Sequence, residues 1–316
     1  MASRHCLRQE GACVQEWIQL LIDGVTIGGV YAVIALGYTL VYGVLRMINF
    51  AHGELFMMGA FTGYFTLTAF ENHSNLNDSL PVLTIAVAIV MGMVVAVTLA
   101  LLMERIAYRP LRNAPRLAPL ISAIGVSILL RNIMLRVTNA QGKVYPQVFP
   151  RTALEIGEIR LLYVQIFLLV LSVFFLALLY LFIQRTKAGV AIRAVAEDRN
   201  TASLMGIDVD RTIMTTFAAG AALAGAAGVV YGMFVTTATS DMGFIPGIKA
   251  FTAAVLGGIG SVPGAMAGGY FLGITEALST KFFGAQYKDV VAFILLVGVL
   301  IFRPWGLFGK REDKRA

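Results

Sequence analysis

Long apolar runs, separated by short polar segments, make up most of this chain. They lie near residues 17–45, 50–70, 80–103, 117–137, 161–184, 212–236, 244–262, 264–281 and 288–303. A helix of about 20 apolar residues crosses the hydrocarbon core of a bilayer, so runs of this length predict membrane-spanning helices. The pattern therefore predicts an all-α, polytopic membrane protein of about eight transmembrane helices, with broken or re-entrant elements.

Two of these runs are poor simple spans. The run 117–137 contains Arg131 and Arg136, and the run 244–262 ends in a glycine-rich break. The number of crossings therefore stays open by about one or two. Around one transmembrane domain at 17–303 we expect a polar N-terminal leader at 1–16 and a basic tail at 304–316.

Composition supports the membrane class. The chain is 58% hydrophobic and 14% charged, whereas a soluble domain is about 45–50% apolar and about 25% charged. The net charge of +7 does not indicate a nucleic-acid partner, because Lys and Arg gather in a few short loops and the tail rather than forming a groove for phosphates.

The distribution of basic residues predicts the orientation in the membrane. The loops 104–116 and 185–211 and the tail are rich in Lys and Arg, whereas 71–79 and 237–247 contain neither. Basic short loops stay in the cytoplasm, so we expect the C-terminus inside and the loop 138–160 outside. The side of the N-terminus stays open, because its arginines favour the inside whereas the count of crossings does not require it.

Small residues recur at helical spacing in the run 212–236. Gly220, Ala224 and Gly228 lie four residues apart and so share one helical face, with Gly225 nearby. Small residues at this spacing let two membrane helices approach closely. We interpret this face as a helix-packing surface.

A first polar cluster interrupts the apolar runs at Asn49, His52, Gly53 and Glu54. Polar groups at membrane depth are costly unless they face protein or water. One interpretation is a broken helix that lines a translocation pathway. The other is a helix start, which Asn49 caps and at which Glu54 favours the positive end of the helix. The two interpretations are compatible.

A second candidate pathway segment is rich in glycine. Its residues Gly257, Gly258, Gly260, Ser261 and Gly264 lie between two apolar runs. Such a sequence does not continue a helix, and irregular backbone at membrane depth must be buried or line a wet cavity. The segment either lines or gates a pathway or forms a tight hairpin between two helices.

A third segment lies in a basic loop. Glu197, Asp198, Asn200, Thr201, Ala202, Gly206 and Ile207 belong to a short predicted helix. Asp198 can cap its start and Gly206 can end it. The helix either docks into another protein or is a solvated connection.

Enzymatic signatures are missing from the sequence. There is no G-x-x-x-x-G-K-[ST], G-x-S-x-G or H-E-x-x-H motif, and the three histidines are far apart. The two cysteines, Cys6 and Cys13, lie in the leader and cannot build a disulfide framework. We therefore expect no enzyme, no metal site and no cofactor.

The three segments, taken with their flanks, resemble one family of membrane proteins. The matching stretches are Tyr38–Gly43, Arg46–Glu54, Ala196–Ile207 and Lys249–Ala265. They are similar to the LivH-type permease subunit of bacterial ABC importers for branched-chain amino acids. The similarity extends over nearly all of 20–308 and leaves out the leader.

This resemblance implies a location and a set of partners. The expected partners are a LivM-like second permease subunit, two cytoplasmic ABC ATPase subunits, a periplasmic or extracellular solute-binding protein, an amino-acid substrate and the lipid bilayer. The expected location is the bacterial cytoplasmic (inner) membrane. ATP hydrolysis would belong to the separate subunits.

The resemblance also implies that the basic loop at 197–207 is the ATPase coupling loop. Importer permeases often carry E-A-A-x-x-x-G at this place. This chain has Asn200-Thr201-Ala202 followed by Gly206, which keeps the small residue and the glycine but lacks the acid. The resemblance therefore supports the position of the coupling helix more than a role for any one of its side chains.

Two alternatives stay open at this point. Permeases for urea or other small polar solutes are similar proteins of the same class. An ion-coupled secondary transporter would carry paired acids inside the membrane, and Glu54 and Glu276 keep that class possible.

Overall fold

The computed structural model describes residues 2–74, 77, 80–112, 114–115, 117–148, 153–156, 159–303 and 305–308, and for residues 2–14, 73, 74, 153, 155, 156 and 159 it describes the backbone alone. Most of the predicted basic tail and the side chains of Cys6 and Cys13 lie outside the described part.

Helices form nearly all of the described chain, as the apolar pattern predicts. The long helices are α1 (Ala2–Leu45), α2 (His52–Ser74), α4 (Pro81–Met103), α5 (Leu117–Val137), α6 (Tyr163–Arg185), α9 (Val209–Val235), α10 (Phe244–Gly257), α11 (Val262–Phe283) and α12 (Lys288–Phe302). The shorter ones are η1 (Glu104–Tyr108), η2 (Arg109–Leu111), α7 (Lys187–Glu197), α8 (Arg199–Leu204) and η3 (Ala285–Tyr287). The predicted all-α, polytopic membrane fold is confirmed.

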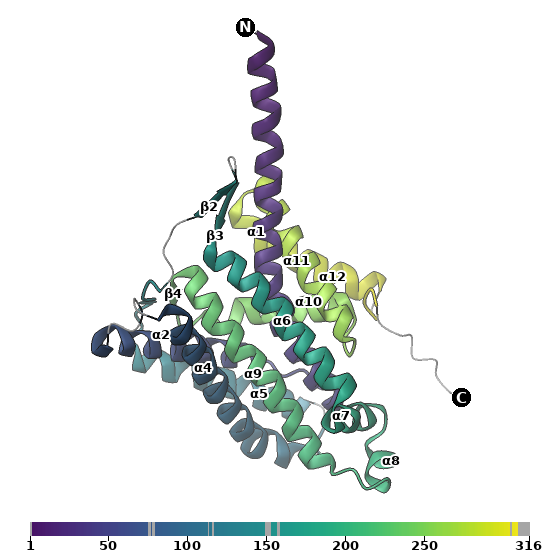
Figure 1. Cartoon of the computed structure of the whole chain (residues 1–316). Coiled ribbons are helices and arrows are strands. Elements are labelled where there is room, and N and C mark those ends of the chain that lie inside the picture. Colours follow the sequence, from purple (N-terminus) through teal and green to yellow (C-terminus); the bar gives the residue numbers. More distant parts are fainter. Residues whose placement is uncertain are drawn as a thin grey trace.

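Two small antiparallel sheets lie between the helices. Strand β1 (Lys143–Val144) pairs with β4 (Thr237–Ala238), and β2 (Ala153–Ile156) pairs with β3 (Ile159–Leu162). The first pairing ties the connection after α5 to the connection after α9. Figure 1 shows β2 and β3 at one end of the molecule and α7 and α8 at the other. We call the end that carries the β2–β3 hairpin the hairpin face, and the opposite end the α8 face.

Six helical segments in the described part are long and apolar enough to cross a membrane, compared with about eight predicted. α2 and α11 have 23 and 22 residues, which is long enough for a span of about 33 Å. Polar residues such as His52, Glu54 and Glu276 make them less apolar, but these side chains are buried against other helices. α5, predicted to be a poor simple span, is one uninterrupted helix of 21 residues.

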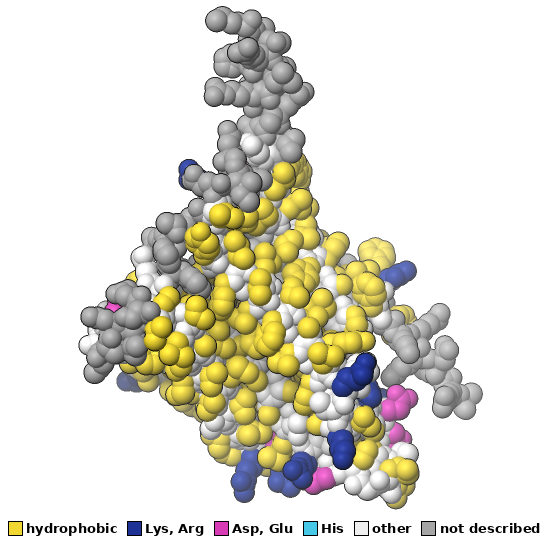
Figure 2. Space-filling view, in the orientation of Figure 1, with side chains coloured by type: hydrophobic (Ala, Val, Ile, Leu, Met, Phe, Trp, Pro, Cys, Tyr) yellow, Lys and Arg dark blue, Asp and Glu magenta, His cyan; other side chains and the backbone are white. Residues whose placement is uncertain are grey.

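The surface has the character of a membrane protein. Apolar side chains cover a broad band across the middle of the molecule, whereas Lys and Arg side chains gather near the α8 face (Figure 2). A bilayer solvates such a band. The basic residues therefore distinguish the α8 face from the rest of the described surface in this view.

Close backbone contacts hold the helices together. A Cβ atom on Gly225 of α9 would lie 2.5 Å from the carbonyl oxygen of Gly92 on α4, and one on Gly59 of α2 would collide with the carbonyl oxygen of Gly225. On the predicted small-residue face, Gly220 approaches α1 and Gly228 approaches α2. The interpretation of this face as a packing surface is confirmed.

We expect Gly225→Ala to separate α4 from α9 and to lower stability by about 1–3 kcal/mol, because the added methyl group overpacks the contact. Thermal unfolding of the purified protein in detergent measures this effect. Gly298→Ala is the control: Gly298 lies in α12 with no atom near its missing Cβ, so the helix should gain about 0.5–1 kcal/mol. Equal effects of the two substitutions would contradict the packing role.

Candidate functional site

Asn49 organises the start of α2. The segment 46–51 connects α1 to α2, and Asn49 Oδ1 accepts hydrogen bonds from the backbone N–H of Ala51 (3.0 Å) and from the Tyr108 hydroxyl (2.6 Å). Asn49 Nδ2 has no hydrogen-bond partner among the described residues. The geometry is that of the predicted helix start. The hydrogen bond from Tyr108 connects this helix start to η1.

His52 is buried at the contact of three helices. Its ring lies 4.7 Å from the Tyr38 ring on α1, and a Cβ atom on Gly220 of α9 would lie 3.6 Å from His52 Cε1. The side chain is 1% exposed. The His52 side chain therefore packs α2 against α1 and α9.

The first turns of α2 and α10 meet inside the protein. A Cβ atom on Gly243, the residue before α10, would lie 2.6 Å from the carbonyl oxygen of Gly53 and 2.8 Å from Glu54 Oε2. Each helix start carries a partial positive charge, which a carboxylate stabilises. Glu54 is therefore placed where two helix N-termini converge, an arrangement that transporters with discontinuous helices use to bind solutes.

The carboxylate of Glu54 is only half satisfied. Its Oε1 accepts a hydrogen bond from Ser127 Oγ on α5 (2.9 Å), and its Oε2 has no hydrogen-bond partner among the described residues. The residue is 1% exposed. A buried acceptor without a partner is costly, so this oxygen is suited to accept a hydrogen bond from a bound polar group.

The glycine-rich segment forms a tight hairpin at the other end of α10. Gly257 ends α10, Ser261 Oγ accepts from the Gly264 N–H (3.2 Å) at the start of α11, and a Cβ atom on Gly257 would overlap the carbonyl of Gly264. Gly258 and Gly260 adopt φ values of 102° and 96°, which favour glycine.

The chain after α12 closes this hairpin. The backbone N–H groups of Leu307 and Phe308 donate to the carbonyls of Leu256 (2.8 Å) and Gly257 (3.1 Å). α10 has 14 residues, so about 21 Å of helix separates this hairpin from Gly243 and Glu54. The structure therefore does not bring the two predicted pathway segments together.

The short helix predicted in the basic loop is confirmed as α8. The Asp198 carboxylate accepts from the N–H groups of Asn200 (2.7 Å) and Thr201 (3.0 Å). These hydrogen bonds lower the pKa of Asp198, and the one from Thr201 has the larger effect. Glu197 is the last residue of the preceding helix, α7.

Gly206 ends α8 as predicted. Its φ is +83°, its N–H donates to the Ser203 carbonyl, and the Ile207 N–H donates to the Ala202 carbonyl, both at 3.0 Å. This is the Schellman pattern, which requires a left-handed residue. Leu204 and Met205, just before it, are 87% and 79% exposed, so α8 presents apolar side chains to its surroundings.

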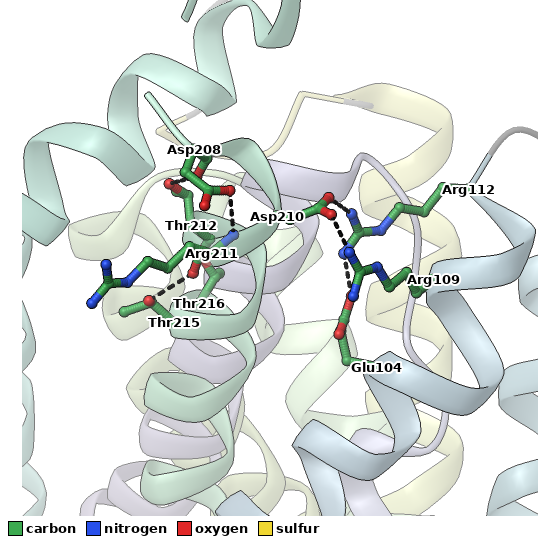
Figure 3. A network of polar contacts seen from close by, with 9 residues as sticks. All are labelled: Glu104, Arg109, Arg112, Asp208, Asp210, Arg211, Thr212, Thr215 and Thr216. Atoms are coloured by element: carbon green, nitrogen blue, oxygen red, sulfur yellow. Dashed lines mark hydrogen bonds and ion pairs between the residues drawn. The ribbon is translucent and has the colours of Figure 1, made fainter. Parts of the chain in front are cut away.

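Polar contacts tie α8 and the start of α9 to other helices. The Arg199 guanidinium donates to the Val44 carbonyl at the end of α1, at 2.7 Å from Nη2. In the network of Figure 3, Arg112 pairs with both Glu104 and Asp210, and Arg109 pairs with Asp210 at 2.6 Å. Asp210 lies in the first turn of α9, so this network joins α9 to η1 and η2.

A buried ionic cluster joins α10, α11 and α12, and it was not predicted from the sequence. Lys249 Nζ on α10 lies 2.7 Å from Glu276 Oε1 on α11 and 2.5 Å from Asp289 Oδ1 at the start of α12. The Tyr31 hydroxyl on α1 donates to Glu276 Oε2 (2.9 Å). The sequence does contain a signal for this cluster, since Lys249 and Glu276 lie in neighbouring apolar runs. Unpaired charges are rare at membrane depth, so two such residues are expected to pair.

A second ion pair was also missed. Arg131 of α5 pairs with Asp241, in the non-helical segment before α10. The sequence showed Arg131 but gave no partner for it. Among the described residues, no group of three or more His, Cys, Asp or Glu side chains is arranged to hold a metal ion.

Comparison with known proteins gives one consistent result. A family model described as "Branched-chain amino acid transport system / permease component" matches residues 20–300. The high-affinity branched-chain amino acid transport system permease protein BraD of Pseudomonas aeruginosa is 44% identical over 96% of this chain and 99% of its own length.

Two further relatives cover almost the same part of the chain. The high-affinity permease protein LivH of Escherichia coli (strain K12) is 42% identical over 95% of this chain and 97% of its own length. A probable LivH of Methanocaldococcus jannaschii is 28% identical over 92% of both chains. These relatives are transport permeases rather than enzymes. No solved structure matches the chain.

We expect Lys249→Met to destabilise the protein by about 3–5 kcal/mol, because it leaves the buried Glu276 carboxylate without its cation. Thermal unfolding in detergent measures this loss. The double variant Lys249→Met/Glu276→Met should recover part of it, because the buried carboxylate is removed and only Asp289, whose side chain is 40% exposed, is left without Lys249. If Lys249→Met unfolds at the wild-type temperature, the cluster does not hold α10, α11 and α12 together.

Proposed function

The chain belongs to the branched-chain amino acid transport permease family, and from this premise we propose that it is a transmembrane subunit of an ATP-driven ABC importer. Its cargo is branched-chain, hydrophobic amino acids, which enter the cytoplasm. The near full-length similarity to BraD and LivH is the observation that carries this proposal.

The partners follow from this role. A permease without a nucleotide-binding motif needs an external source of energy, which we assign to two cytoplasmic ABC ATPase subunits. A LivM-like permease would complete the membrane part, and a periplasmic or extracellular binding protein would deliver the amino acid. Selection of the cargo then takes place mainly outside the membrane.

We assign α8 as the coupling helix on which an ATPase subunit docks. Its capped ends make it a defined structural unit, and its exposed Leu204 and Met205 offer apolar side chains to a partner. The assignment covers the whole predicted coupling loop, which consists of Glu197, Asp198, Asn200, Thr201, Ala202, Gly206 and Ile207.

The contacts of α8 provide a route by which docking would move the membrane helices. Arg199 holds the Val44 carbonyl, and Val44 lies five residues before Asn49 in the chain. Only four residues separate α8 from α9, and Asp210 connects α9 to η1 and η2. A rigid-body shift of α8 would therefore move the end of α1, which precedes Asn49, and, through α9, the η1 and η2 helices, which contact Asn49 through Tyr108.

This role also sets the orientation. With α8 in the cytoplasm, the hairpin face lies outside and the end of α12 inside, as the positive-inside rule predicts. Since α1 ends beside α8, the N-terminus lies outside. The membrane is the bacterial inner membrane.

We assign the solute pathway to the neighbourhood of Asn49, His52, Gly53 and Glu54. Support comes from the meeting of two helix N-termini at a half-satisfied carboxylate. We assign Gly257, Gly258, Gly260, Ser261 and Gly264 to the other end of α10, where the hairpin would move together with α10 when the pathway opens.

Purification and reconstitution test this function. The chain, expressed with the neighbouring transport genes, should copurify with a second permease and two ATPase subunits. In proteoliposomes with ATP inside and the binding protein outside, the complex should accumulate leucine, isoleucine and valine. Accumulation of urea alone, or accumulation that a proton or sodium gradient drives without ATP, would overturn the proposal.

We expect Arg199→Gln to uncouple ATP hydrolysis from uptake, because the charge-assisted hydrogen bond to Val44 is worth about 1.5–3 kcal/mol. Uptake should fall about tenfold while the complex still assembles and hydrolyses ATP. Lys187→Gln removes an exposed positive charge at the start of α7, outside the coupling loop, and should leave the ratio of ATP hydrolysed to leucine imported unchanged. A normal ratio in Arg199→Gln would contradict the route through Val44.

A further inference from the structure

The Arg131–Asp241 ion pair lies beside the place where α2 and α10 begin. We propose that this pair is a transient binding site in the membrane for the two charged ends of a zwitterionic amino acid. Arg131 binds the carboxylate, and Asp241, together with the unpartnered Oε2 of Glu54, binds the ammonium. The proposal rests on the proposed function and adds a substrate site to it.

The depth of the pair in the membrane supports this site. Ser127, which donates to Glu54, is the middle residue of α5. Arg131 lies one turn further along this helix, about 6 Å from the middle in the direction of the hairpin face. Asp241 lies two residues before Gly243, whose backbone touches Gly53. The pair is thus located in the outer half of the span.

The exposure of the pair shows that an aqueous space or another protein must cover it. The Arg131 and Asp241 side chains are 42% and 63% exposed. Ionised side chains at this depth do not face lipid, and they mark solute pathways when they line a cavity. α5 is the helix that positions Arg131, and its exposed face also carries Asn132. This face is therefore suited to border a conduit between two subunits.

A second, independent observation points to a ligand. Glu54 is 1% exposed, and its Oε2, near Gly243, has no hydrogen-bond partner among the described residues. Ser127, one helical turn before Arg131, donates to this carboxylate, and Gly243, two residues after Asp241, lies beside its free oxygen. Three charged groups from α2, α5 and the segment before α10 therefore surround one place, and one buried acceptor there is available.

The chemistry of the exchange suits a transported solute. An amino acid carries one carboxylate and one ammonium group, so it can replace each half of the Arg131–Asp241 pair with an opposite charge. The guanidinium can hold a carboxylate through two parallel hydrogen bonds, and the ammonium needs acceptors, which Asp241 and Glu54 supply. Binding breaks the Arg131–Asp241 ion pair and forms one pair at each end of the amino acid. Because the loss of the existing pair offsets part of the gain, the site binds weakly and releases its cargo.

Transport by the reconstituted complex tests this site. We expect Arg131→Gln and Asp241→Asn each to lower leucine uptake at least tenfold, while ATP hydrolysis stimulated by the binding protein stays within about twofold of wild type. The ratio of ATP hydrolysed to leucine imported should therefore rise at least fivefold. Arg136→Gln, five residues further along α5 and also exposed, is the matched control and should transport normally.

The reversed pair Arg131→Asp/Asp241→Arg separates substrate binding from a structural role. It keeps an ion pair between α5 and the segment before α10, so the complex should assemble. However, an arginine at position 241 would engage the free oxygen of Glu54 and remove it as an ammonium acceptor, and the positions of the cation and the carboxylate relative to Glu54 would be exchanged. Uptake should therefore stay at least tenfold below wild type.

Each outcome bears on a different claim. Wild-type uptake in Arg131→Gln, or full recovery in the reversed pair, would overturn the binding site and leave the importer function intact. Absence of ATP-driven leucine uptake by the wild-type complex would instead overturn the proposed function. Loss of assembly in Arg131→Gln together with recovery in the reversed pair would make the pair a structural contact, which also overturns the site.

Discussion

Direct contact between helix backbones is the constraint on which the rest of this structure depends. Lipid tails are as apolar as leucine, so membrane helices associate through close packing rather than through the hydrophobic effect. Gly59, Gly92 and Gly225 remove the side chains that would separate α2, α4 and α9. The same kind of contact between Gly53 and Gly243 brings two helix starts together, and the candidate site exists only because of that approach.

The buried polar groups differ in how completely they are satisfied. Glu276 has a lysine and a tyrosine hydroxyl as partners, so its role is to hold helices together. Asn49 Oδ1 accepts two hydrogen bonds at the start of α2. Glu54 keeps one oxygen without a partner among the described residues, although it lies in an equally buried position. Asn49 Nδ2 is also without a partner there, but the free oxygen of Glu54 lies beside Gly243, where α2 and α10 begin, and this position makes Glu54 the carboxylate that is available to a solute.

α10 connects the candidate solute site at Glu54 to the glycine-rich hairpin at Gly257. Its first turn contacts Gly53 beside Glu54, and its last residues accept hydrogen bonds from the chain after α12. Lys249, between these ends, joins it to α11 and α12 through Glu276 and Asp289. A helix that is fixed along its length in this way moves as a unit, so a displacement of one end reaches the other.

The sequence by itself determined the membrane class, the positions of the long helices and the capped ends of α8, because length, apolar character and cap residues are local properties. Asp198 and Gly206 illustrate this, since their partners lie within five residues. Only the tertiary structure decided that Lys249 meets Glu276, that Arg131 meets Asp241, and that the hairpin at Gly257 lies far from Glu54. The physical reason is that such pairs depend on which helices are neighbours. In apolar runs the pattern of side chains gives little information about the face that each helix turns toward its neighbours.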